Sequence, residues 1–258
     1  MTISVSFTVL SVCCMCFLGV MLYQQFTRKA ENLTVENARQ LLNQTTINLE
    51  DYLRNMRRIS DAMYYTVIKD TDIGSENLDD SMTLLYEANK DKLVSVACYT
   101  NDGNLTAAAP IATEKAGADV SSQNWFQDAV GELENFHFST PHVQDLFDDP
   151  SYRYYWVVSL SRTVELTRNG SSLLGVLLVD MNYSSIKQLL DKANTDTSGE
   201  YVYLMAPDGQ IIYHPKQNLI YMGLYQENNS KAAKYEDTTV KENFLGEKRL
   251  VTVKTISY

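Results

Sequence analysis

Two stretches of the sequence decide the fold: YYWVVSLSRTVE at Tyr154–Glu165 and SLLGVLLVDM at Ser172–Met181. Both have the apolar content of strands, and the second is nearly continuously apolar, a pattern typical of a strand that is covered on both faces. Asp180 is the only ionisable residue in the second stretch. We therefore expect Ser172–Met181 to be a central strand that carries one carboxylate near its end, and a buried carboxylate needs a partner.

Outward from these strands, the sequence predicts two strand–turn–strand units of the same design. The first turns at Asn101-Asp102-Gly103 and the second at Pro207-Asp208-Gly209. Asp-Gly pairs favour tight hairpin turns, because glycine adopts a positive φ without steric cost. The strands around these turns are expected at Leu93–Thr100, Asn104–Pro110, Glu200–Ala206 and Gln210–His214. Further helices are expected at Ser81–Asp91, Ser122–Val130 and Ser184–Ala193, and further strands at Phe136–Gln144, Thr238–Phe244 and Lys248–Tyr258.

These elements group into two successive α+β modules with antiparallel sheets, over residues 71–195 and 196–258. The second module reaches the end of the chain without a strand that closes its sheet. Such a sheet would present an unpaired edge. We therefore expect the second module to be incomplete.

An apolar segment precedes both modules. No residue before Arg28 has an acidic or basic side chain, and Ile3–Tyr23 would span about 30 Å as a helix. We predict a transmembrane helix over residues 1–27. A cleaved signal peptide is the alternative, but it would have a basic start, a shorter apolar run and a small-residue cleavage site. None of these three features is clear in the sequence.

Residues 28–70 are predicted to form one long stalk helix. No Pro or Gly occurs from Ala30 to Lys69, and apolar or small residues recur at alternating spacings of three and four, which places a seam on one helix face. The seam residues are Val35, Ala38, Leu42, Thr45, Leu49, Tyr52, Met56, Ile59 and Met63. Two alternatives stay open. The seam packs against the domain that follows, or it pairs in parallel with a second copy to form a homodimer.

Composition excludes several classes of function. The chain has 258 residues, with 22 Lys and Arg against 32 Asp and Glu, and its net charge of −10 disfavours binding to nucleic acid or to an anionic membrane surface. Three of the four cysteines lie in the apolar segment and Cys98 stands alone, so the sequence predicts no disulfide framework and no metal site. The three histidines, His137, His142 and His214, lie in no catalytic motif. We expect no catalytic site, metal or cofactor in this chain.

Three stretches together resemble the double Cache sensor region of bacterial membrane receptors: YYWVVSLSRTV, GVLLVDMNYSSIKQLL and PDGQIIYHPKQNLI. The sequences of these stretches resemble most closely those of the YesM-like sensor histidine kinases. The resemblance implies two PAS-like modules, with residues 71–195 distal and 196–258 proximal to the membrane. It also implies an extracytoplasmic sensor in the cell membrane, although Arg28 and Lys29 taken alone would favour a cytoplasmic C-terminal side.

The resemblance implies that this chain is the ligand-sensing portion of a two-component sensor histidine kinase that lacks its cytoplasmic output region. The input domain of a methyl-accepting chemotaxis receptor is one alternative, because a fold does not determine its output. A stand-alone membrane-anchored binding or adhesion module is another.

A small-molecule pocket in the distal module would need aromatic walls and a few placed polar groups. The candidates are Trp125, Phe126, Tyr154, Trp156, Arg162 and Asp180. Asp180 could accept an amine from a ligand. The alternative is an Asp180–Arg162 ion pair within an ordinary aromatic core, and Trp156 on its strand fits such a core better than a ligand contact.

The recognition motif of the amino-acid receptors in the double Cache family has a Trp-Tyr pair and a strand-end Asp. Trp125-Phe126 and Asp180 resemble these residues, but Gln123 stands where the motif has an Arg that binds the ligand carboxylate. Glutamine lacks the bidentate cationic fork of arginine. The resemblance therefore does not extend to amino-acid sensing, and a sugar, an amine, a peptide or another metabolite stays open.

Overall fold

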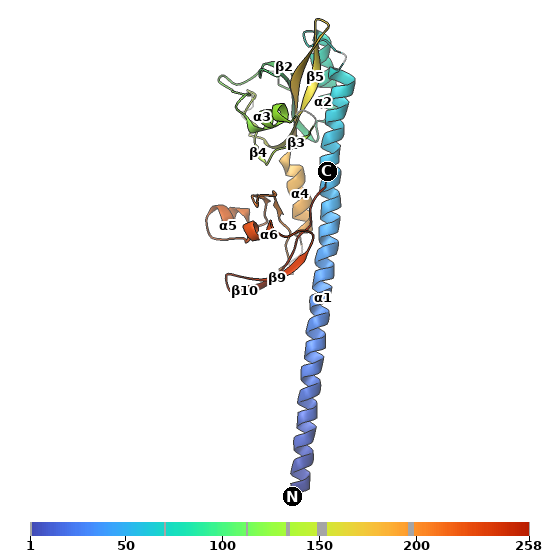
Figure 1. Cartoon of the computed structure of the whole chain (residues 1–258), viewed down its shortest axis with the longest axis vertical. Coiled ribbons are helices and arrows are strands. Elements are labelled where there is room, and N and C mark those ends of the chain that lie inside the picture. Colours follow the sequence, from blue (N-terminus) through green and yellow to red (C-terminus); the bar gives the residue numbers. More distant parts are fainter. Residues whose placement is uncertain are drawn as a thin grey trace.

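The computed structural model describes residues 2–69, 71–111, 113–132, 135–148, 154–195 and 199–257, with side chains from residue 10 onward apart from that of residue 76. Met1, Asp70 and Tyr258, which belong to expected elements, lie outside the described residues. One very long helix runs beside two bodies that follow one another along it (Figure 1). We call these bodies the large-sheet region (residues 71–195) and the C-terminal region (residues 199–257). The α+β class, the long N-terminal helix and the antiparallel sheets are as expected.

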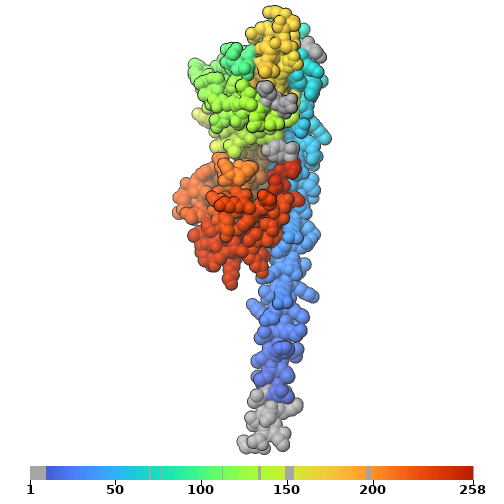
Figure 2. All heavy atoms as spheres, viewed as in Figure 1, coloured from blue at the N-terminus to red at the C-terminus, as the bar shows by residue number. Residues whose placement is uncertain are grey.

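Helix α1 (Thr2–Ala62) leads directly into a π-helical segment, η1 (Met63–Ile68). The N-terminal part of α1 extends beyond both bodies (Figure 2) and exposes large apolar side chains, among them Phe17, Tyr23 and Phe26. By length and composition, this helix could cross a membrane.

The seam of α1 is buried within its own chain. Leu49, Met56 and Met63 belong to a hydrophobic core that also contains strands of the large-sheet region. Val35 and Ala38, nearer the N-terminus, are half-buried beside the C-terminal region. Packing of the seam against the domain that follows is thus confirmed, and pairing with a second copy stays a prediction.

The large-sheet region is built on an antiparallel sheet with the strand order β2-β1-β6-β5-β3, and β4 also pairs with β5. The strands are β1 (Leu93–Thr100), β2 (Leu105–Ala109), β3 (His137–Phe138), β4 (His142–Val143), β5 (Trp156–Arg168) and β6 (Ser171–Asn182). The helices are α2 (Glu76–Asn89), α3 (Asn124–Gly131) and α4 (Tyr183–Ala193). The nearly continuous apolar run of β6 occupies the middle of the sheet, as its sequence predicts.

The two faces of this sheet are covered by different helices, because successive side chains of a strand point to opposite faces. Helices α1 and α2 cover the face that carries Leu160 and Val179. Helix α3 covers the face that carries Tyr99 and Leu178. Gly175 on β6 allows a close approach of β1, since a Cβ there would clash with the Tyr99 carbonyl oxygen.

The C-terminal region consists of two small hairpins and two short helices. Strand β7 (Leu204–Met205) pairs with β8 (Ile211–Tyr213), and β9 (Thr239–Phe244) pairs with β10 (Glu247–Thr252). Helices α5 (Gln217–Tyr221) and α6 (Asn229–Ala232) lie between the hairpins in sequence. The region is attached to α1 by an ion pair of 2.6 Å between Lys241 and Glu31, and by a hydrogen bond of 3.0 Å from the Ser257 amide to Glu50.

Three expected strands differ from the structure. The strand expected at Phe136–Gln144 is interrupted, and Pro141, which has no N–H to donate, lies between β3 and β4. The strand expected at Glu200–Ala206 is reduced to β7, and the one expected at Lys248–Tyr258 ends at Thr252. The other elements agree with the expected ones to within a few residues.

Candidate functional site

The first candidate site surrounds Asp180 on β6. Asp180 pairs with Ser159 of β5 on one side and with Ser95 of β1 on the other, so the three side chains share the face covered by α3. The Ser95 hydroxyl donates to one carboxylate oxygen at 2.6 Å and the Ser159 hydroxyl donates to the other at 2.5 Å. Asp180 is only 1% exposed. Within the described part of the chain, no Lys or Arg forms an ion pair with it.

Burial raises the pKa of the Asp180 carboxyl above its ordinary value, and hydrogen bonds from Ser159 and Ser95 and the charge of His142 oppose this rise only in part. Two hydroxyl donors replace only part of the hydration that an ionised carboxylate has in water. A cation placed beside Asp180 would favour its ionised form.

His142 on β4 extends the polar network toward solvent. Its Nε2 lies 3.4 Å from the Ser159 hydroxyl, and its Nδ1 lies 3.0 Å from the Thr140 carbonyl oxygen. A carbonyl oxygen only accepts hydrogen bonds, so this contact requires the proton on Nδ1. The half-buried His142 thus links the enclosed carboxylate to the surface.

Trp125 and Phe126 on α3 are buried against the same face of the sheet that carries Asp180. Helix α3 is held on the sheet by two hydroxyls of β5. The Ser161 hydroxyl donates to the Trp125 carbonyl oxygen at 2.8 Å, and the Thr163 hydroxyl donates to the Ala129 carbonyl oxygen at 2.5 Å. The sequence places both aromatic residues correctly on a short helix, and the structure brings that helix to the face that carries Asp180.

Tyr99 on β1 belongs to this site, although sequence reasoning missed it. Its ring lies 5.8 Å from the Trp125 ring, and its buried hydroxyl has no hydrogen-bond partner among the described residues. Burial raises the pKa of Tyr99 far above its ordinary value, with further contributions from Glu114 and Asp180. The hydroxyl therefore stays protonated and able to donate. Its position in the alternating strand LVSVACYT, on the same face as Ser95, was the available sequence signal.

Arg162 does not belong to this site, and the alternative of an Asp180–Arg162 ion pair is wrong. Asp180 stands opposite Ser159 in the β5–β6 register. Arg162 is three positions further along β5, so its side chain points to the other face of the sheet. There its Nη1 forms an ion pair of 2.6 Å with Asp61 of α1, and its guanidinium lies 4.9 Å from the centroid of the Tyr64 ring.

The structure also separates Tyr154 and Trp156 from Asp180. Tyr154 precedes β5 and is 83% exposed. Trp156 is the first residue of β5 and is 52% exposed, so the expectation that it belongs to the core is wrong. Trp156 has the same strand parity as Arg162 and therefore points away from the face of Asp180. Of the six predicted residues, Trp125, Phe126 and Asp180 lie on the same face of the sheet.

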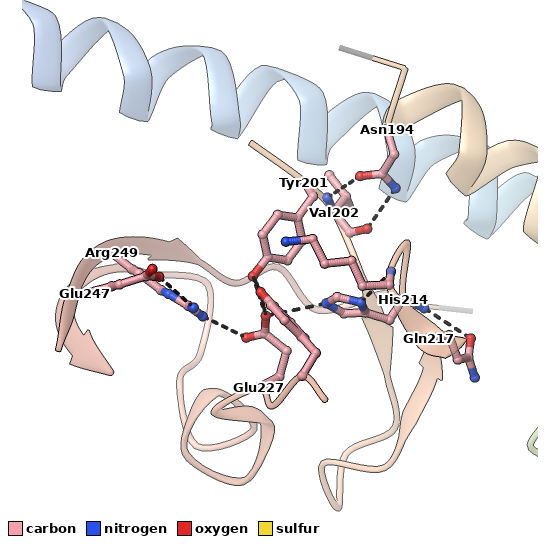
Figure 3. Close-up of polar contacts among 10 residues, drawn as sticks. Asn194, Tyr201, Val202, His214, Gln217, Glu227, Glu247 and Arg249 are labelled. Carbon is pink, nitrogen blue, oxygen red and sulfur yellow. Dashed lines mark hydrogen bonds and ion pairs between the residues drawn. The ribbon is translucent and has the colours of Figure 1, made fainter. Parts of the chain in front are cut away.

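A second polar cluster lies in the C-terminal region, and it was also not predicted from the sequence. The Glu227 carboxylate accepts hydrogen bonds from the Tyr201 hydroxyl and, at 2.8 Å, from the Tyr225 hydroxyl. Arg249 of β10 lies 3.4 Å from its other oxygen. His214 Nε2 approaches to 3.5 Å but without hydrogen-bond geometry. Figure 3 shows Tyr201, His214 and Arg249, from separate segments of the chain, converging on Glu227.

The donors around Glu227 change its titration. Burial alone would raise the pKa of Glu227, but His214, the two tyrosine hydroxyls and Arg249 together lower it to about 2. Glu227 is thus a buried carboxylate whose charge is already balanced. Its partners lie up to 48 positions apart in sequence (249 − 201), which explains why no local pattern revealed the cluster.

Comparison with known proteins identifies the family. The family model of the Cache domain matches residues 24–258. The chain belongs to the Cache domain family. The match includes most of α1 and both bodies beside it, so the Cache assignment covers the Asp180 site and the Glu227 cluster alike. No curated protein matches the sequence.

Several solved structures share the fold of this Cache protein. One is the ligand-binding domain of the Campylobacter jejuni chemoreceptor Tlp3 in complex with 4-methylisoleucine, with 14% identity, 84% of each chain covered and a TM-score of 0.61. Another is the ligand-binding domain of the Pseudomonas aeruginosa amino acid chemoreceptor PctC in complex with GABA, with 17% identity, 81% of this chain and 86% of that chain covered, and a TM-score of 0.59. At these identities the likeness shows a common fold.

Proposed function

We propose that this chain is the extracytoplasmic ligand-sensing portion of a membrane receptor, with residues 71–195 as the membrane-distal Cache module and residues 196–258 as the proximal one. Three features support the proposal: the Cache family match, the exposed apolar N-terminal part of α1, and the alignment of both bodies along that helix. Residues 1–27 would anchor the receptor in the membrane. Residues 28–70 would then carry changes in the sensor toward the membrane.

The distal site at Asp180 binds a small molecule that carries an amine. The observation that supports this most directly is a buried carboxylate with two hydroxyl donors and no Lys or Arg ion-pair partner among the described residues. An amine supplies positive charge, the Tyr99 hydroxyl offers a further donor, and Trp125 and Phe126 provide an apolar wall. Both similar structures named above hold ligands that contain an amine. Gln123 in place of the carboxylate-binding Arg favours an amine without an α-carboxylate.

Arg162 couples the distal site to the stalk helix in this proposal. Strand β5 presents Ser159 to Asp180 on one face and Arg162 to Asp61 of α1 on the other. A shift of β5 that accompanies ligand binding therefore acts directly on α1, one residue before its last helical residue and next to the π-helical segment η1. A ligand shifts such an equilibrium only by binding one arrangement more tightly than the other.

In this proposal the receptor passes its signal to a histidine kinase region, because the sequences of the motifs are most similar to those of the YesM-like kinases. A chemotaxis receptor is the alternative, because a fold does not determine its output. Ligand-dependent transfer of phosphate from ATP to a histidine of the receptor itself would identify the kinase. Its absence, with ligand-dependent control of a separate kinase, would identify the chemotaxis receptor.

Thermal unfolding of the full chain in detergent micelles, with a panel of amines, amino acids, sugars and organic acids, tests the ligand proposal. A ligand at a hundred times its dissociation constant adds about 2.7 kcal/mol to the free energy of unfolding. We expect an amine to raise the midpoint, and Asp180→Asn to abolish the shift. Asp102→Asn, at an exposed acid in the β1–β2 turn, is the matched control and should keep it. A shift that survives Asp180→Asn, or no shift across the panel, would overturn the proposal.

A further inference from the structure

A chain of hydrogen-bonding atoms joins the Asp180 carboxylate to the imidazole of His142. The Ser159 hydroxyl lies 2.5 Å from a carboxylate oxygen of Asp180 and 3.4 Å from Nε2 of His142. On the other side of the ring, Nδ1 lies 3.0 Å from the Thr140 carbonyl oxygen. His142 stands opposite Val157 in the β4–β5 register, two positions from Ser159, so its ring lies on the face of the sheet that carries Asp180.

The hydrogen bonds of this chain depend on the charge of His142. The Thr140 carbonyl oxygen fixes one proton on Nδ1, so Nε2 donates only when the ring is an imidazolium. The Ser159 hydroxyl has a single proton, and donating it to the Asp180 carboxylate leaves none for Nε2. With a neutral ring, the lone pairs of Nε2 and of the Ser159 oxygen therefore face each other. With an imidazolium, Nε2 donates to Ser159 and Ser159 donates to the carboxylate, so each atom of the chain has a partner.

Asp180 is the acid that gains most from an imidazolium at this position. Within the described residues, no Asp or Glu lies at ion-pair distance from the His142 ring. Burial raises the pKa of Asp180, and the charge of His142 opposes that rise from across Ser159. On the neighbouring elements, Asp145 follows β4 and Asp128 lies on α3, and both are exposed. Solvent screens these two charges, whereas Asp180 is enclosed.

We infer that His142 is the counter-ion of Asp180 before a ligand binds, with Ser159 between them, and that an arriving amine takes over this role. Because it concerns the same carboxylate, this inference rests on the proposed function. An imidazole changes its charge between about pH 5 and 8. The imidazolium therefore competes with an amine in acidic surroundings, and it no longer competes at mildly alkaline pH. The distal site thus binds its ligand more weakly as the surroundings become acidic.

A double-mutant cycle without any ligand tests the pairing of His142 with Asp180. Urea unfolding of the full chain in detergent micelles is measured for the wild type, His142→Gln, Asp180→Asn and the double variant. At about pH 5.5 the effects of the two single variants should not add up to that of the double variant, and at about pH 8.5 they should add. His137→Gln provides the control cycle, because His137 is also half-buried but contacts the Glu132 carbonyl oxygen. Its effect should add to that of Asp180→Asn at both pH values.

Calorimetric titration with butylamine hydrochloride tests the competition. The ammonium group of butylamine stays protonated over this pH range, as that of a lysine side chain does. Wild type and His142→Gln should bind butylamine equally at about pH 8.5. At about pH 5.5 the wild type should bind about tenfold more weakly than His142→Gln, the factor that corresponds to one pH unit below the ordinary pKa of an imidazole.

The two experiments separate failure of this inference from failure of the proposed function. Additive effects of His142→Gln and Asp180→Asn at both pH values, a coupling that does not change with pH, or an equal coupling with His137→Gln would overturn the pairing. Parallel pH profiles of butylamine affinity in wild type and His142→Gln would overturn the competition. A coupling that disappears at alkaline pH, without binding of butylamine at any pH, would support the pairing of His142 with Asp180 and overturn the proposed amine site.

Discussion

Asp180 in the large-sheet region and Glu227 in the C-terminal region both have largely buried carboxylates, and their acidities move in opposite directions. Asp180 in the large-sheet region is 1% exposed and its pKa is raised by burial. The Glu227 side chain in the C-terminal region is 6% exposed, yet its pKa falls to about 2. Asp180 is the more deeply buried of the two, and its partners also differ: it has two serine hydroxyls, whereas Glu227 has two tyrosine hydroxyls, an arginine and a nearby histidine ring.

This difference distinguishes a structural carboxylate from one that is available to a ligand. Glu227 joins β10 to segments that precede and follow β8, and its charge is satisfied before any ligand arrives. Asp180 forms no ion pair with a Lys or Arg of the described residues, and the charge of His142 offsets the cost of its burial only in part. A buried group whose ionisation is still costly is a better candidate for binding than one whose charge is balanced.

The largest expected effect is on the Glu227 cluster. Glu227→Gln should lower the free energy of unfolding by roughly 2 kcal/mol near neutral pH, because it removes the charge that two tyrosine hydroxyls and Arg249 surround. Urea denaturation of the full chain in detergent micelles, followed by tyrosine fluorescence, measures the change. Glu236→Gln, at an exposed acid of the same region, should change the value by less than about 0.5 kcal/mol. Equal effects of the two variants would show that Glu227 does not hold the region together.

The corresponding change at Asp180 should have the opposite sign. Asp180→Asn replaces a carboxyl that is costly to ionise with a neutral side chain of the same shape, and the Ser95 and Ser159 hydroxyls can reorient to pair with it. We expect the free energy of unfolding to rise by about 1 kcal/mol at pH 7, while binding of the amine ligand is lost. The same urea titration measures the stability. A clear loss of stability would mean that the Asp180 carboxylate is structural, like Glu227.

The two carboxylates should also contribute to stability in different pH ranges. The pKa of Glu227 is lower in the folded state, so its contribution is fully present above pH 4.5 and is lost as the pH falls toward about 2. The pKa of Asp180 is higher in the folded state, so its contribution is fully present below its ordinary pKa of 3.8 and is lost as the pH rises from there.

Unfolding measured from about pH 2 to about pH 7 for the wild-type chain and both variants tests this division. The difference between wild type and Glu227→Gln should shrink below pH 4.5. The difference between wild type and Asp180→Asn should grow above pH 3.8. Parallel curves for all three proteins would contradict both assignments.

Much of the fold could be predicted from the sequence because its signals are local. The apolar run of β6, the Asp-Gly turns and the uninterrupted seam of α1 each depend on neighbouring residues. The strand-end position of Asp180 followed from the same run. The Glu227 cluster could not be predicted, because its members come from segments that only the tertiary fold brings together.

The predicted Asp180–Arg162 ion pair failed for a different reason. Strand alternation could be predicted from the sequence, but the register of the two strands could not. Strand alternation places Arg162 and Asp180 on the same face or on opposite faces according to the register of β5 against β6. That register, Ser159 opposite Asp180, is visible only in the structure. A shift by one residue would have brought Arg162 to the face of Asp180. The ion-pair alternative therefore depended on a register that the sequence does not determine.

The smallest expected effect concerns Trp156, the predicted residue that the same register places outside the Asp180 site. Trp156→Ser should change the free energy of unfolding by less than about 1 kcal/mol, because its side chain is half exposed, and should leave the affinity for the amine ligand unchanged. Trp125→Leu, at the buried tryptophan of α3, is the contrast and should weaken ligand binding clearly. Calorimetric titration of both variants with the amine found by thermal unfolding measures this. If Trp156→Ser weakened binding as much as Trp125→Leu, the ligand would contact the opposite face of the sheet, and Asp180 would not be its partner.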